Sequence, residues 1–149
     1  MAVDLYKPFL EATRSVFQLM LDLSDVKDCP VENITHGDAL SVAVGVTGDL
    51  TGDVFYHFPR VTSINMVALM SGMEVDIVDD FVTSAVAEIA NIISGNVLTL
   101  LSGDNLVCDI LPPELRALSD REDDAPHKAS ILSTSLGEVF LDIRLTPKN

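Results

Sequence analysis

Apolar and polar positions along the chain repeat with two different periods, and each period predicts one type of element. From Leu5 to Leu23 apolar residues recur every three or four positions, as in an amphipathic helix. Asp4 is placed to cap that helix, and a loop is expected to follow through Cys29-Pro30 to Gly37. The first fifth of the chain therefore predicts a helix that buries one face.

The next stretch changes to a period of two. Leu40–Val46 alternates large apolar residues with small or polar ones, and Val54–Phe58 continues as a second apolar strand segment. Between them Gly48–Asp53 consists of residue types that form turns. Together these segments predict an antiparallel hairpin.

Two helices are expected in the middle of the chain. Pro59 precedes a short helix over about Val61–Met70, and Gly72 ends it. Asp79 and Asp80 then introduce a longer helix that runs to about Leu101, because acidic residues suit the first turn of a helix.

The C-terminal third predicts more strands. Leu106–Leu111 is strand-like, Glu114–Lys128 is polar and predicts an exposed loop or covering flap, and Ser130–Thr134 with Val139–Leu145 predicts a closing hairpin. Such alternation indicates an antiparallel sheet with one face covered. Long helices on one face of a mainly antiparallel sheet make an α+β two-layer fold, and 149 residues suit a single domain over residues 1–149.

The order of elements also suggests an internal duplication. A long helix, two strands and a short helix are followed by a second long helix and further strands. Aligning Glu11 with Glu88 brings the two long helices roughly into register. We therefore expect two related halves in one domain.

Charge and composition narrow the class of partner. The chain has 9 Lys and Arg against 23 Asp and Glu, for a formal net charge of −14. Nucleic acid and anionic membranes would be repelled over most of such a surface, whereas a partner that presents Lys or Arg would be attracted. Cys29 and Cys108 show no paired spacing, and no secretory signal or long apolar run is visible, so a cytoplasmic location is expected.

The second long helix carries the strongest candidate for function. A polar stripe with spacings of 4, 3 and 4 residues runs along it: Ser84, Glu88, Asn91 and Gly95. Glu88 is the only charge between Phe81 and Leu101. Its outward neighbours are expected to be small residues that permit close approach, namely Ala87, Ser94 and Gly95. The Glu88–Asn91 spacing alone is a weak motif, but this setting predicts a docking face.

One helix position does not fit this division, and other groups favour simpler interpretations. Asn96 falls towards the apolar side, which predicts a buried, hydrogen-bonded side chain. The histidines share no metal-ligand spacing, and no serine lies in a Gly-x-Ser-x-Gly elbow. Asp76, Asp79 and Asp80 would suit Ca²⁺, but helix capping explains them more simply. No metal site is predicted.

The residues around the polar stripe resemble a known family. Ala87–Asn96 resembles the Glu-x-x-Asn signature helix of the CheC/CheX phosphatases of bacterial chemotaxis. Val46–Gly52 with Val54–Phe58 resembles the first hairpin of that family, and Ser130–Leu145 resembles its closing hairpin. Pro8–Thr13 is similar to the opening helix of CheX. The resemblance spans nearly the whole chain and implies the CheC-like fold.

The resemblance implies a specific activity. Members remove phosphate from the aspartyl phosphate of a CheY-type receiver domain, so the chain is expected to be a protein aspartyl-phosphate phosphatase. Asn91 would orient the attacking water, and Glu88 would pair with a lysine of the receiver. The receiver would hold the Mg²⁺, so no cofactor of the chain's own is expected. The likeness to CheX also implies a homodimer.

Only one such site is expected. CheC-type members carry the signature on both long helices, whereas the first helix here has Glu11 but Arg14 in place of the asparagine. An arginine has only donors and cannot accept a hydrogen bond from a water. Two alternatives remain open: a non-enzymatic adaptor that docks a receiver or a flagellar switch component, and a structural dimer-forming domain.

Overall fold

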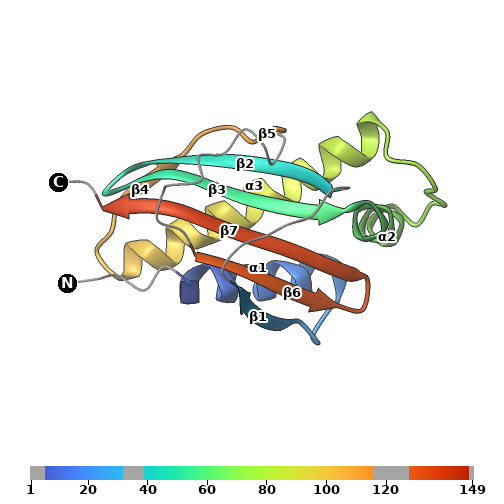
Figure 1. Ribbon diagram of the computed structural model, residues 1–149, viewed down its shortest axis with the longest axis horizontal. Helices are drawn as coiled ribbons and strands as arrows, with labels where there is room; N and C mark the ends of the chain where they lie inside the picture. Colours follow the sequence, from blue (N-terminus) through green and yellow to red (C-terminus); the bar gives the residue numbers. More distant parts are fainter. Residues whose placement is uncertain (1–5, 32–38, 116–127, 148–149) are drawn as a thin grey trace.

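An antiparallel sheet is the framework of the molecule (Figure 1). The computed structural model describes residues 6–31, 39–115 and 128–147. The strand order is β1-β6-β7-β3-β2-β4, with β5 also paired to β2. The strands are β1 (Lys27–Val31), β2 (Ala39–Gly48), β3 (Leu50–Pro59), β4 (Cys108–Ile110), β5 (Glu114–Leu115), β6 (Lys128–Thr134) and β7 (Gly137–Pro147).

Two long helices cover one face of this sheet. The helices are α1 (Tyr6–Leu21), α2 (Arg60–Ser71) and α3 (Asp80–Gly103). Figure 1 shows α1 and α3 behind the strands, whereas α2 lies at the end of β3. Thr62 and Asn65 of α2 donate to backbone carbonyls at the β6–β7 turn, at 2.8 Å and 2.9 Å. The predicted α+β fold with helices on an antiparallel sheet is confirmed.

The sheet order also has the symmetry expected from an internal duplication. β3 and β7 pair at the centre, β2 and β6 flank them, and β4 and β1 lie outside. α1 precedes β1, β2 and β3, and α3 precedes β4, β6 and β7. Each half thus places its first strand beside the hairpin of the other half, which ties the two halves together.

The helices begin and end close to the capping and terminating residues that the sequence predicts. Asp79 caps α3, because its side chain accepts a hydrogen bond from the Val82 amide at 3.1 Å. Gly72 ends α2 in the left-handed conformation, at a φ of 69°, and its amide donates to Ala68 at 3.0 Å. α3 runs slightly beyond the predicted Leu101, to Gly103.

The first hairpin is tighter than its turn-forming residues predict. β2 extends through Gly48 and β3 begins at Leu50, so most of Gly48–Asp53 lies in strands. Gly52 explains part of this difference. Its φ is 140°, and a Cβ there would collide with the carbonyl oxygen of Arg144 on β7. A glycine that indicates a turn locally instead permits close pairing with a distant strand.

Two segments expected to be loops contain strands. Lys27–Val31 forms β1 and pairs with β6, and Pro30 is accommodated because β1 is an edge strand. Of the expected loop Glu114–Lys128, the first two residues form β5 beside β2, Lys128 begins β6, and 116–127 lie outside the described residues. Both differences arise from pairing with strands far along the chain.

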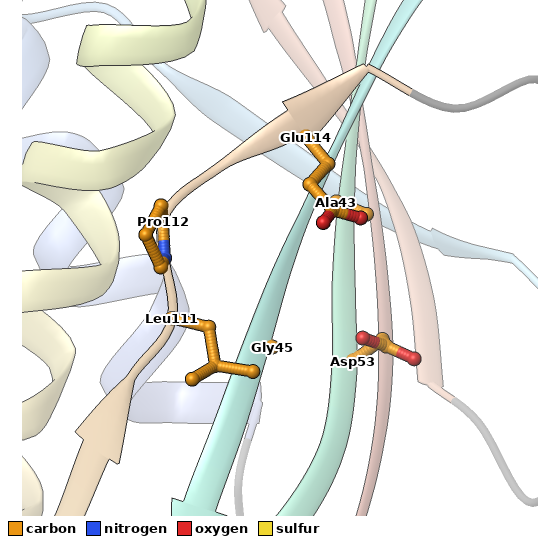
Figure 2. A pocket seen from close by; sticks show the side chains of 6 residues that line it. All are labelled: Ala43, Gly45, Asp53, Leu111, Pro112 and Glu114. Carbon is orange, nitrogen blue, oxygen red and sulfur yellow. The ribbon is translucent and has the colours of Figure 1, made fainter.

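The β4–β5 connection packs closely on the sheet edge. The Leu111 amide donates to the Gly45 carbonyl at 2.9 Å, and Figure 2 shows the Leu111 side chain beside Gly45. A Cβ on Gly45 would lie 2.8 Å from Leu111 Cδ1, so glycine is needed for this approach. The predicted strand Leu106–Leu111 is correspondingly short, with only Cys108–Ile110 in ladder pairing.

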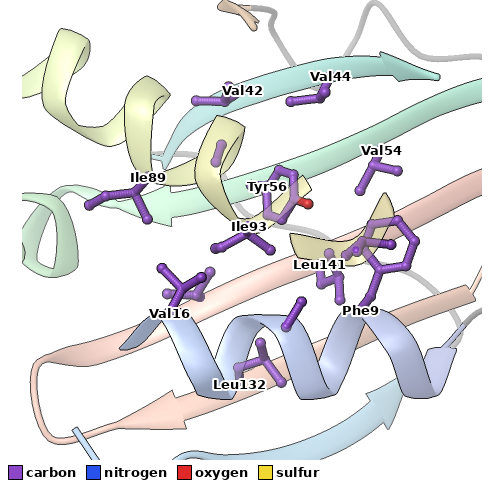
Figure 3. Packing of buried hydrophobic residues seen from close by; sticks show 14 of the residues in the cluster. Phe9, Val16, Val42, Val44, Val54, Tyr56, Ile89, Ile93, Leu132 and Leu141 are labelled. Atoms are coloured by element: carbon purple, nitrogen blue, oxygen red, sulfur yellow. The ribbon is translucent and has the colours of Figure 1, made fainter. Parts of the chain in front are cut away.

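The core lies between the sheet and the helices (Figure 3). Alternate residues of β2 and β3 point into it, including Val42, Val44 and Tyr56, and α3 contributes Ile89 and Ile93. Burial of each such aliphatic side chain is worth roughly 1.5–3 kcal/mol. α3 is long and apolar enough by length and composition to cross a membrane, and in this fold its apolar face forms part of this core.

The face of the sheet that points away from the helices is more buried than the uncovered face of a sheet with helices on one side only. Asp142 and His57 are 0% exposed, and Arg144 is 8% exposed. Arg144 Nε donates to Asp142 Oδ2 at 3.3 Å, and His57 Nδ1 lies 2.8 Å from Ser41 Oγ. Alternation alone predicts that these polar positions face solvent, so that expectation is wrong here.

Candidate functional site

The predicted functional pair lies on the exposed side of α3. Glu88 is exposed, Asn91 is half-buried, and both lie within one continuous helix. Side chains three residues apart on a helix have Cβ atoms about 5–6 Å apart, so Glu88 and Asn91 can contact the same group. Among the described residues neither side chain has a hydrogen bond or ion pair, which leaves both available to a partner.

The neighbouring docking positions divide into two groups. Ser84 is exposed, and Ala87 and Gly95 are half-buried, so these three lie around the pair as predicted. Ser94 does not. It is 2% exposed, its Oγ lies 2.9 Å from Tyr56 Oη, and it donates to the Ala90 carbonyl at 2.9 Å.

The burial of Ser94 corrects its predicted role. Ser94 lies roughly 40° around the helix from Ala90, which is fully buried, so both face the sheet. There its hydroxyl pairs with Tyr56, and burial raises the pKa of the Tyr56 phenol well above its usual range. Ser94 attaches α3 to β3 and does not lie on the exposed side of α3, where the docking face was predicted.

Asn96 is the opposite case. It is exposed, and its Nδ2 donates to the Ile92 carbonyl at 2.9 Å. The prediction of a buried role for Asn96 is therefore wrong, although the hydrogen bond is present. The buried side of α3 is displaced towards Ser94 and away from Asn96, because the helix packs against both the sheet and α1.

Gly95 differs from the glycines of the sheet. A Cβ built on Gly95 would meet nothing within 4 Å, whereas the same atom on Gly45 or Gly52 would collide with a neighbouring strand or side chain. No packing in the described structure requires glycine at 95, and glycine in a helix interior costs about 0.5–1 kcal/mol relative to alanine. An external contact is a consistent reason for its small size.

The first long helix lacks an equivalent site. Arg14 Nε and Nη2 both donate to the Val26 carbonyl at 3.2 Å, and Nη2 also donates to Asp28 Oδ1 at 3.1 Å. Glu11 is 4.0 Å from Lys7 Nζ in an exposed pair. Arg14 thus attaches α1 to β1, as expected for a helix that serves as scaffold.

A residue missed by the sequence interpretation also lies near the pair. Phe81 is 52% exposed and precedes Glu88 by seven residues, which places it within roughly 20° of Glu88 around the helix. The sequence does contain a signal for Phe81. It is a large apolar side chain seven positions before Glu88, on a ridge whose other residues are small or polar.

Other parts of the described structure offer weaker candidates for a functional site. A hollow of about 220 Å³ on the opposite face of the sheet is lined by Ala43, Gly45, Asp53, Leu111, Pro112 and Glu114 (Figure 2). Within residues 6–31, 39–115 and 128–147, no group of three or more His, Cys, Asp or Glu side chains is arranged to hold a metal ion. Cys29 and Cys108 are free thiols. The Glu88–Asn91 ridge therefore remains the best-supported site.

Known proteins resemble the chain in both sequence and structure. A protein from Thermotoga maritima named CheY-P phosphatase CheX is 30% identical over 105 residues, which cover 66% of this chain and 68% of the relative. Two solved structures share the fold. The CheX of a CheX–CheY–BeF3–Mg complex from Borrelia burgdorferi matches with a TM-score of 0.81, 24% identity and coverage of 97% and 99% of the two chains.

The second structure, the chemotaxis protein CheX from Vibrio vulnificus, has a TM-score of 0.82 and 21% identity, and 97% of each chain is covered. The sequence profile of the family described as "Chemotaxis phosphatase CheX" matches residues 40–135, which include both Glu88 and Asn91. The chain belongs to the CheX family of chemotaxis phosphatases.

Proposed function

We propose that this protein accelerates hydrolysis of the aspartyl phosphate of a CheY-type receiver domain, and so tunes chemotaxis or a related two-component pathway. The observation that carries the proposal is the pair Glu88 and Asn91, one turn apart on an exposed helix face and without partners among the described residues. The 30% identical relative is itself named a CheY-P phosphatase.

Asn91 supplies the chemistry of this proposal. Its Oδ1 accepts a hydrogen bond from a water, and its Nδ2 donates to a phosphoryl oxygen, so the water lies in line with the bond to be broken. The water oxygen bonds to phosphorus as the P–O bond to the aspartate breaks. The aspartate leaves as a carboxylate, and both protons of the water remain on inorganic phosphate. Positioning is most of what such a reaction requires.

Glu88 anchors the partner. Its carboxylate forms an ion pair with the receiver's lysine, which places Asn91 over the phosphoryl group. The receiver holds the Mg²⁺, which neutralises charge on the phosphoryl oxygens. The Borrelia structure, whose complex contains CheX, CheY, BeF3 and Mg, is consistent with a metal that arrives with the partner.

The docking face consists of Ser84, Ala87 and Gly95 around this pair. Their small side chains let a receiver loop approach the helix closely, and Gly95 has open space outside it. The protein also presents sheet edges at β1 and at β4–β5, and strand pairing at such an edge would give the homodimer that we propose. The two free thiols suit a cytoplasmic location.

The competing function is an adaptor that binds a receiver or a flagellar switch component without hydrolysis. The two are separated by mixing the purified protein with several phosphorylated CheY-type receivers and following phosphate release. Faster release from at least one receiver supports the enzyme. Binding without faster release from any receiver would support the adaptor.

A further inference from the structure

Exposed apolar residues concentrate beside the proposed site. Eleven large hydrophobic side chains are exposed in the described part of the chain, and six of them lie between residues 61 and 81. They are Val61 (66%), Leu69 (51%), Met70 (38%), Met73 (60%), Ile77 (57%) and Phe81 (52%). This segment comprises α2, the α2–α3 connection and the first turn of α3, and we call it the α2–α3 surface. Exposed apolar residues gathered in one segment make that segment a candidate binding surface.

The α2–α3 surface is continuous with the proposed site. Phe81 and Glu88 point in nearly the same direction from α3, with their Cα atoms about 10 Å apart along the axis. Ser84, which is exposed, lies between them. A partner that reaches Glu88 and Asn91 along this helix therefore passes over Phe81.

The connection holds its apolar side chains outward. Val75 and Val78 are partly buried and pack against the core. Met73, which precedes Val75, and Ile77, which lies between the two valines, are exposed. Arg60 Nη2 lies 3.5 Å from the Asp76 carbonyl. An open groove of about 500 Å³ runs here, lined by Ala68, Met73, Glu74, Val75 and Asp76. Val75 and Val78 thus anchor the connection to the core, and the residues around them are exposed.

The charge around these residues favours one kind of occupant. The segment 60–81 contains four acidic residues, Glu74, Asp76, Asp79 and Asp80, and one basic residue, Arg60. All four acidic residues are exposed. Two copies of this surface facing each other would bring like charges together, which costs free energy. A partner with an apolar side chain flanked by Lys or Arg fits instead.

We propose that the α2–α3 surface is the specificity-determining contact for the receiver domain. This inference rests on the proposed function. The receiver contacts Glu88 through its active-site lysine, and about 10 Å away along α3 it presents an apolar side chain, next to a basic one, to Phe81. The Glu88–Asn91 pair serves every receiver with this chemistry, whereas the α2–α3 surface selects among them.

The test measures phosphate release at varied receiver concentrations. The double variant Phe81→Ser/Met73→Ser is compared with Leu19→Ser, since Leu19 is 82% exposed on α1 and lies outside this surface. We expect the double variant to raise KM about 10-fold with kcat within about twofold, which corresponds to ~1.4 kcal/mol of binding. Leu19→Ser should change neither value. Glu74→Lys should also raise KM, and less so at high salt.

Several outcomes would overturn the proposal. An unchanged KM in the double variant, with parental thermal unfolding, removes the α2–α3 surface from the receiver contact. Conversion of a dimer to a monomer with KM unchanged would assign the surface to a second copy. Asn91→Ala serves as the reference in the same assay. If it loses acceleration while the double variant does not, only this inference fails, whereas full activity of Asn91→Ala would remove the proposed function itself.

Discussion

α1 and α3 occupy matching places in the two halves of the fold, yet the outward side chains of the two helices make different contacts. On α1, Arg14 donates three hydrogen bonds to Val26 and Asp28 and thereby holds β1. On α3, Asn91 occupies the aligned position and has no hydrogen bond among the described residues. One helix uses the position for internal attachment, and the other leaves it available.

The difference shows how a duplicated fold can keep one site. The two halves interlock through β1 with β6 and β4 with β2, so both helices are needed for the sheet and its core. In the function that we propose, only α3 needs an available Glu-x-x-Asn face. Once Arg14 binds the backbone of the β1 side, α1 cannot present an acceptor there without losing that attachment.

The largest expected effect is on the α3 side of this comparison. Asn91→Ala should slow receiver dephosphorylation about 100-fold while leaving binding nearly unchanged, because the amide acts on the water in the transition state; 100-fold corresponds to ~2.7 kcal/mol. The assay is phosphate release from a radiolabelled receiver. Acceleration equal to that of the parent protein would remove the catalytic assignment and favour the adaptor.

Glu88→Ala should act mainly on binding. Loss of the ion pair with the receiver's lysine should weaken complex formation about 10-fold, or ~1.4 kcal/mol, and the loss should be greater at low salt, where the pair is least screened. Titration calorimetry with a beryllofluoride-loaded receiver at two salt concentrations measures this. Glu11→Ala on α1 is the matched control and should leave affinity unchanged.

Arg14→Ala should show the reverse pattern. It removes the attachment between α1 and β1 and should lower the free energy of unfolding by about 1 kcal/mol. The effect is no larger because Arg14 is partly exposed, so solvent screens its interaction with Asp28. Turnover should remain within about twofold of the parent value. A large loss of turnover in folded protein would show that α1 takes part in the reaction, contrary to the comparison.

Gly95 provides a smaller test of the docking face. Gly95→Ala should raise the free energy of unfolding by about 0.5–1 kcal/mol, because alanine favours the helical conformation more than glycine does. The added Cβ would meet no atom within 4 Å, so it introduces no clash. Gly95→Leu should be stabilised similarly but should raise KM by blocking close approach. Denaturant unfolding and phosphate release together measure both. If the leucine variant binds receivers normally, Gly95 lies outside the contact.

The smallest effect expected is at the buried contact between α3 and the sheet. Tyr56→Phe should lower the free energy of unfolding by about 1 kcal/mol or less, since Ser94 keeps its hydrogen bond to Ala90 when the phenol is removed. Turnover should change little. Thermal unfolding beside the phosphatase assay would test whether Ser94 is structural, as its burial indicates.

The sequence alone was sufficient for the parts of this protein that depend on local patterns. The period of α3, its cap at Asp79 and the end of α2 at Gly72 follow from residues within one or two turns. The closing hairpin follows from alternation between β6 and β7. The exposure of Glu88 also follows, because a lone charge among apolar residues determines which side of a helix faces out.

Other features depend on contacts between segments far apart in the chain. β1 is a strand because β6 pairs with it, and Gly52 lies in a strand because β7 passes against it. Ser94 is inside and Asn96 outside because Tyr56 and α1 determine where the buried arc of α3 ends. Periodicity locates the centre of a buried face, whereas its edges depend on which neighbours pack against them, and those neighbours are known only from the tertiary structure.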